Sequence, residues 1–203
     1  MEILLSLFAG LGLAAAAGFR VFVPLLAVGL AARIEVLALS DGFAWMGSNG
    51  ALIVFATATL VELLGYYLPW VDNLLDTIAS PAAVVAGIVL TAAVLTDLDP
   101  TLRWALAVVA GGGTSATFQG LTAGTRAVTT FATGGVANPL VSTVEALAST
   151  LLAALAVLVP IAAAASVVLL FAFVAKRTVL RRRRPAGPGP TPGELTATPD
   201  GRR

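Results

Sequence analysis

Two arginines and two glutamates stand inside long apolar stretches, and they are the side chains best placed to do chemistry. They are Arg20, Glu62, Arg126 and Glu145. A charge inside a bilayer costs at least about 2.5–3.5 kcal/mol, so such residues generally face a partner or a water-filled cavity. A guanidinium group can hold a carboxylate or a phosphate with two hydrogen bonds. The arginines could therefore bind an anionic solute, and the glutamates could carry protons.

A structural role explains the same four residues equally well. Each arginine would pair with a glutamate of the other half of the chain. Arg20 would then pair with Glu145, and Arg126 would pair with Glu62. The sequence leaves both interpretations open.

Hydroxyl and amide side chains gather around the second arginine, in a segment rich in glycine and threonine. They could line a solute or ion pathway, or they could make hydrogen bonds between closely packed helices. The candidates are Gln119, Thr129, Thr130, Thr133, Asn138, Ser142 and Thr143.

The sequence offers few ligands for a metal ion or a cofactor. There is no cysteine and no histidine, which removes thiolate and imidazole ligands. Asp72 and Asp76 are four residues apart, hence on one helical face. They could ligate a cation through hard oxygens, or they could form the solvated face of an interfacial helix. No nucleophile stands beside a base, so we expect no cofactor and no enzymatic activity.

The composition is that of an integral membrane protein. Hydrophobic residues make up 58% of the 203 positions and charged residues 11%, whereas soluble domains average about 25% charged. Eight of the twelve Lys and Arg residues lie after residue 175. That cluster is a topological signal that places its end of the chain in the cytoplasm, and we expect no nucleic-acid partner.

The apolar stretches predict about six transmembrane helices in an all-α, polytopic fold. Gly18 and Pro24 should break or bend the first one, since proline removes a backbone donor. A re-entrant turn is expected at Gly134-Gly135. No polar loop separates the last two spans, so one long kinked helix is an alternative. The spans are 3–32, 51–68, 81–95, 102–126, 139–159 and 160–174.

Short motifs recur in the same order in the two halves. Ala17-Gly18-x-Arg20 matches Ala123-Gly124-x-Arg126, and Val61-Glu62-x-Leu64 matches Val144-Glu145-x-Leu147. Pro81 and Pro160 open a third pair. With three spans each, the halves (about 3–97 and 100–177) would have opposite orientations, the plan of many secondary transporters.

Six spans put both termini in the cytoplasm. Residues 1–177 then form the transmembrane domain. Residues 178–203 are basic and afterwards rich in Pro, Gly and Thr, and we expect a disordered tail.

Several longer motifs resemble an uncharacterised family of bacterial membrane proteins, domain of unknown function 4126. They are Gly18-Phe-Arg-Val-Phe-Val-Pro24, Tyr66–Pro81, Ala110-Gly-Gly-Gly113 and 133–143. The likeness covers nearly all of residues 5–177 and implies a protein of the same fold in the bacterial cytoplasmic membrane. It implies no activity. In general style the chain is also similar to DedA-type proteins, which combine re-entrant segments with intramembrane charges.

Three functions compete on this reading. The doubled Arg/Glu pattern and the broken helices favour a small transporter or channel for a polar or ionic solute. A membrane scaffold or subunit, with structural ion pairs, is the alternative, and lipid translocation is a third. The lipid bilayer is the expected partner, and the sequence leaves the solute and any homo-oligomer open.

Overall fold

The part of the chain that the structure describes folds into helices and connecting loops, with no strand. The structure is a computed structural model that describes residues 1–65 and 69–182, with side chains for 1–65, 77–173 and 176. The helices are α1 (Glu2–Phe19), α2 (Phe22–Arg33), the 3-10 turn η1 (Ala44–Gly47), α3 (Asn49–Gly65), α4 (Pro69–Val94), α5 (Pro100–Leu106), the π-helical η2 (Ala107–Gly112), α6 (Gly113–Thr133), α7 (Asn138–Leu158) and α8 (Pro160–Arg182).

The chain divides into two compact units, Met1–Val167 and Val168–Arg203. The first holds α1 to α7 and the start of α8. Of the second, the structure describes only the remainder of α8. Most of the predicted tail, 183–203, lies outside the described residues.

Several helices are long and apolar enough to cross a membrane. Among the described residues they are Glu2–Phe19, Thr77–Val94 and Asn138–Leu158. Shorter apolar helices cover Phe22–Arg33, Asn49–Gly65 and Pro160–Phe173. The all-helical class is as predicted, and these apolar helices are compatible with a membrane protein.

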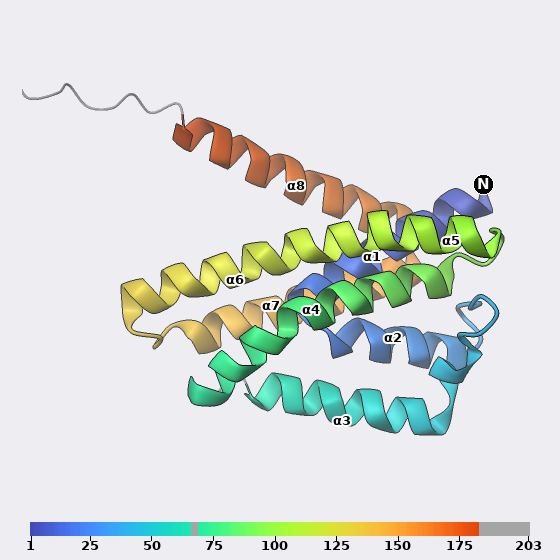
Figure 1. Cartoon of the computed structure of the whole chain (residues 1–203), viewed down its shortest axis with the longest axis horizontal. Coiled ribbons are helices and arrows are strands. Elements are labelled where there is room, and N and C mark those ends of the chain that lie inside the picture. Colours follow the sequence, from blue (N-terminus) through green and yellow to red (C-terminus); the bar gives the residue numbers. More distant parts are fainter. Residues whose placement is uncertain (66–68, 183–203) are drawn as a thin grey trace, which may run out of the picture. The chain divides into compact units, whose positions relative to one another are not determined.

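The first apolar stretch is a helical hairpin. α1 ends at Phe19, Arg20 is extended (φ −146°, ψ 125°), and α2 begins at Phe22. The break at this point was predicted, but the reversal of direction was not. Figure 1 shows α2 returning toward the end of the unit at which α1 begins. Residues 3–32 therefore do not form one continuous crossing.

Small residues let α1, α4 and α6 approach one another closely. A Cβ atom added to Gly18 would stand 2.8 Å from the carbonyl oxygen of Ser115, and one added to Gly87 would stand 2.9 Å from that of Gly111. Alanines fill much of the rest of the core of α1. The interface excludes any larger side chain at these glycines, in the manner of small-residue helix packing in membranes.

The glycine run 111–113 does not interrupt its helix, which widens to a π-helical turn there. α5, η2 and α6 follow one another without interruption, and Gly111 and Gly112 lie in the π-helical turn. Asp99 caps the start of α5 by accepting from the amide of Thr101 at 2.8 Å.

A turn at Gly134-Gly135 and a break at Val159 are seen, and the predicted re-entrant character of the turn stays a prediction. Gly134 and Gly135 adopt φ 62° and φ 88° in the turn between α6 and α7, a conformation that glycine adopts readily. Val159 has φ −142° and ψ 72° between α7 and α8. α7 and α8 are thus separate helices, and the single kinked helix is excluded.

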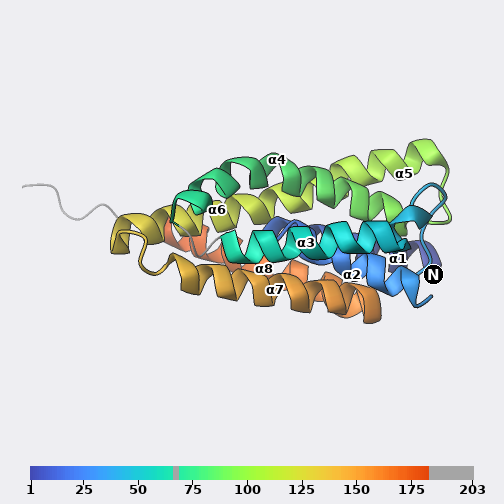
Figure 2. The same cartoon turned by 90° about the horizontal axis from the view of Figure 1, so that it is seen from below.

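Helix directions agree with an inverted repeat only in part. α3 and α7, which carry the two Val-Glu-x-Leu motifs, run in opposite directions (Figures 1 and 2). α1 and α6, which carry the two Ala-Gly-x-Arg motifs, run in the same direction and contact each other. The two halves are therefore not related by inversion along their whole length.

Candidate functional site

The structure brings the four intramembrane charges predicted from the sequence into one buried cluster. Arg20 lies at the apex of the α1–α2 hairpin, Glu62 on α3, Arg126 on α6 and Glu145 on α7. Their exposed fractions are 1%, 6%, 5% and 4%. Two positive and two negative side chains from both halves of the chain thus share one site among the described side chains.

Glu145 is the centre of this charge cluster. Arg20 Nη2 lies 3.3 Å from Glu145 Oε2. Arg126 Nε lies 3.2 Å and 3.1 Å from the two carboxylate oxygens, and Arg126 Nη2 also donates to Oε2. Arg20 donates in addition to the hydroxyl and the carbonyl oxygen of Ser142, the latter at 2.9 Å. The Arg20–Glu145 contact is the one that the pairing hypothesis named, whereas it assigned Arg126 to Glu62.

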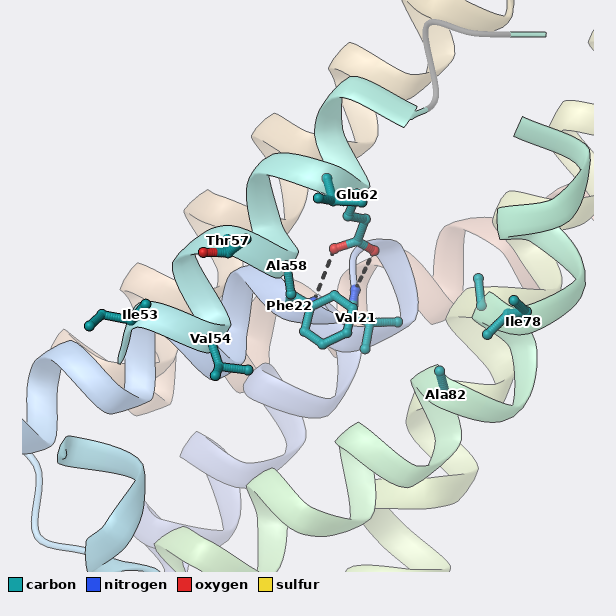
Figure 3. A pocket seen from close by; sticks show the side chains of 11 residues that line it. Val21, Phe22, Ile53, Val54, Thr57, Ala58, Glu62, Ile78 and Ala82 are labelled. Carbon is teal, nitrogen blue, oxygen red and sulfur yellow. Dashed lines mark hydrogen bonds between the residues drawn. The ribbon is translucent and has the colours of Figure 1, made fainter. Parts of the chain in front are cut away.

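Glu62 differs from Glu145, because its carboxylate accepts hydrogen bonds from backbone amides. The amide of Val21 donates to Oε1 at 2.8 Å and that of Phe22 to Oε2 at 3.0 Å (Figure 3). The first amides of a helix lack partners within it, so Glu62 caps α2 from a neighbouring helix. The positive charges of Arg20 and Arg126 lie within electrostatic reach of this carboxylate.

The cluster lies toward one end of its helices. Glu62 is one turn from the end of α3, whereas Arg126 and Glu145 are two turns from the ends of α6 and α7 that meet at the Gly134-Gly135 turn. At 1.5 Å per residue, two turns amount to about 10 Å. In many inverted-repeat transporters the site lies near the middle of the helices. The charge cluster of this protein lies nearer to one end.

A polar stripe follows one face of α6 away from the cluster. Ser115, Gln119 and Thr122 are buried and precede Arg126 at helical spacing. Ser149 continues the buried polar face of α7 and donates to the carbonyl of Ala16 at 2.9 Å. The predicted Gln119 and Ser142 therefore belong to the same buried surface as the charges.

Thr130 and Asn138 lie at the α6–α7 turn rather than in the charge cluster. The Asn138 amide donates to the Thr130 hydroxyl at 3.0 Å, and this pair clasps the hairpin. Thr129, Thr133 and Thr143 each bond to a carbonyl of their own helix. These hydroxyls lie between the cluster and the end of the helices.

The predicted cation site lies outside the described side chains. Asp72 and Asp76 fall in the backbone of α4, within the part whose side chains are not described. Elsewhere, in the described residues, no group of three or more acidic side chains could hold a metal ion.

A groove between α3 and α4 reaches the charge cluster, and the sequence did not predict it. Its volume is about 540 Å³, and its described lining is apolar apart from Thr57 and Glu62. In Figure 3, Val54 and Ala58 of α3 lie toward Ile78 and Ala82 of α4, across the groove. Ala79 and Ala82, three positions apart on α4, are the signal that could have indicated it.

The comparisons with known proteins identify a family and no function. The family described as a domain of unknown function (DUF4126) matches residues 7–179. No curated protein matches the chain, and no solved structure does.

Proposed function

Since the chain belongs to the DUF4126 family, a description that names no activity, we propose a function from the site: a membrane transporter or channel for a small ionic solute. The buried cluster of Arg20, Glu62, Arg126 and Glu145 is its ion-handling centre. Buried ionisable residues in apolar helices commonly mark ion or substrate pathways.

One observation carries this proposal. The cluster is continued in both directions by polar side chains on α6, by Thr130 toward the turn and by Thr122 and Gln119 toward the other end. Ser115 to Thr130 spans about 22 Å at 1.5 Å per residue. The rest of the chain is largely apolar, and apolar packing alone could hold a scaffold together. A scaffold would therefore not need this polar stripe.

The chemistry of the cluster favours an anion that moves together with a proton. Glu62 occupies the amides at the start of α2, where the helix dipole favours negative charge. Protonation of Glu62 would weaken this contact and leave the amides of Val21 and Phe22 to an incoming anion, near the two arginines that Glu145 holds. Loss of the proton would return the carboxylate and release the anion.

Flux through reconstituted protein tests the proposal. We expect liposomes containing the protein to show proton movement, followed with a trapped pH-sensitive dye, when a gradient of chloride, nitrate or formate is imposed. Thr122→Val should slow the flux severalfold. Thr125→Val is the matched control, because its hydroxyl also bonds back to its own helix, at 2.8 Å to Leu121, but it lies on the exposed face. Equal rates in both variants, or no flux with any ion, would refute the pathway.

A membrane scaffold is the second candidate, favoured by the close packing at Gly18, Gly87 and Gly111. On that reading the ion pairs only hold helices together. Replacement of a charge pair by leucines would then leave every function of the protein unchanged.

We also propose a topology in which α1–α2 enters and leaves the membrane on one side, and α3, α4, α5–α6, α7 and the apolar part of α8 cross it. The basic residues after 175 lie in the cytoplasm by the positive-inside rule. Compared with the six predicted crossings, only the N-terminus changes side. Glu2→Cys and Asp97→Cys should react with an impermeant maleimide from the same side and Val136→Cys from the other. Reaction of positions 2 and 136 from one side would contradict the hairpin.

A further inference from the structure

The groove between α3 and α4 is a ligand site in its own right. Its lining side chains Ile53, Val54 and Ile78 are 67%, 61% and 54% exposed, so the groove opens on the outer face of the helices. A volume of about 540 Å³ is within the range of small-molecule sites. The groove is therefore large enough to hold part of an amphiphile.

The lining has two chemically different ends. Ile53 and Val54 mark the apolar end, and Glu62 marks the polar end, nine residues further along α3. That distance is about 13 Å along a helix. The hydrocarbon core of a bilayer contains no water to fill an apolar groove on such helices. Hydrocarbon chains would fill the groove instead.

Glu62 is the charged member of the described lining, and it offers acceptors. A carboxylate has about four acceptor sites, and the amides of Val21 and Phe22 occupy two of them. Arg20 and Arg126 do not line the groove, and both are directed to Glu145. A group at this end of the groove thus meets a negative acceptor before it meets a positive charge.

We propose that the groove binds a membrane amphiphile with an ammonium head, whose aliphatic chain lies between α3 and α4 and whose head donates to Glu62. Glu62 lies one turn from the end of α3, so the head sits near a membrane face and the chain runs inward. This is the orientation that a lipid takes in a bilayer. Glu62 also belongs to the proposed ion-handling centre, but the site is tested by binding and does not require ion flux.

Photo-crosslinking tests the site on the full chain in phosphatidylcholine nanodiscs. The probes are three diazirine-labelled twelve-carbon amphiphiles that differ only in the head: an amine, an alcohol and a carboxylate. We expect the amine to label peptides containing residues 53–62 and 77–82, and unlabelled dodecylamine to compete. The alcohol should bind more weakly, and the carboxylate weakest.

Two kinds of variant separate the chain from the head. Ala58→Phe and, independently, Ala82→Phe fill the groove and should lower labelling by all three probes. Ala154→Phe, on the exposed face of α7, is the matched control and should leave labelling unchanged. Glu62→Gln should lower labelling by the amine about tenfold, to the level of the alcohol, because a charge-assisted hydrogen bond is lost.

If a variant fails to fold, labelling of the unaltered protein by the three probes still tests the proposal. Labels spread evenly over the helices, or equal labelling by the three heads, would overturn the proposal. Flux that persists in Ala58→Phe, with labelling lost, would separate this site from the ion pathway.

Discussion

Replacement of Arg126 by leucine should destabilise the protein strongly. The residue is 5% exposed, and both its Nε and its Nη2 donate to Glu145. Breaking a buried ion pair typically costs about 3–5 kcal/mol, because the remaining charge loses its partner in a medium of low dielectric. For a chain of this size, about 2–4 °C of melting temperature corresponds to 1 kcal/mol. We expect a fall of roughly 6–20 °C.

Two compensating double variants resolve which partner matters. Arg126→Leu with Glu145→Leu leaves Arg20 and Glu62, one charge of each sign, and should recover much of the loss. Arg126→Leu with Glu62→Leu also balances the charges, but it removes the acceptor for the first amides of α2. Loss of such a cap costs about 0.5–2 kcal/mol. The first double variant should therefore be the more stable.

Thermal unfolding in detergent, followed by circular dichroism, measures all four proteins. Arg33→Leu is the control, since Arg33 is exposed and such substitutions stay within about 0.5 kcal/mol. An Arg126→Leu variant as stable as the parent would show that these charges already sit in water and would refute the reasoning. Equal recovery in both double variants would refute the separate role of Glu62.

Three further predictions test the helix packing, the hairpin and the tail. Gly18→Ala should destabilise the protein strongly, because the added methyl group meets the backbone of α6. Gly124 is at the matching motif position with open space around it, so Gly124→Ala should be neutral or stabilising by up to about 1 kcal/mol. The melting temperatures of the two variants test this prediction. Asn138→Ala should cost about 0.5–1.5 kcal/mol, by loss of the hydrogen bonds to Thr130, without slowing ion flux. Deletion of residues 186–203 should leave the melting temperature unchanged, because that sequence has few apolar side chains to bury.

The sequence by itself determined which residues belong to the charge cluster. Arg20, Glu62, Arg126 and Glu145 stand out because charges are rare and costly inside apolar helices. The chain break at Arg20 and the turn at Gly134-Gly135 were also readable, since backbone irregularity depends on local residue types. The long apolar stretches also predicted the all-helical class.

Only the tertiary structure decided how these parts are arranged. That Glu145 serves both arginines, and that Glu62 caps α2 instead, depends on which helix faces pack together. Small residues form much of those faces, mainly alanine and glycine on α1 and serine and threonine on α6 and α7. The same residue types also occur on the exposed sides of these helices, so the sequence holds no pattern that singles out one contact. The reversal at Arg20 and the groove beside Glu62 also depend on how the helices pack. Gly18, just before the reversal, lies against the backbone of α6, and the groove lies where α3 and α4 make few contacts.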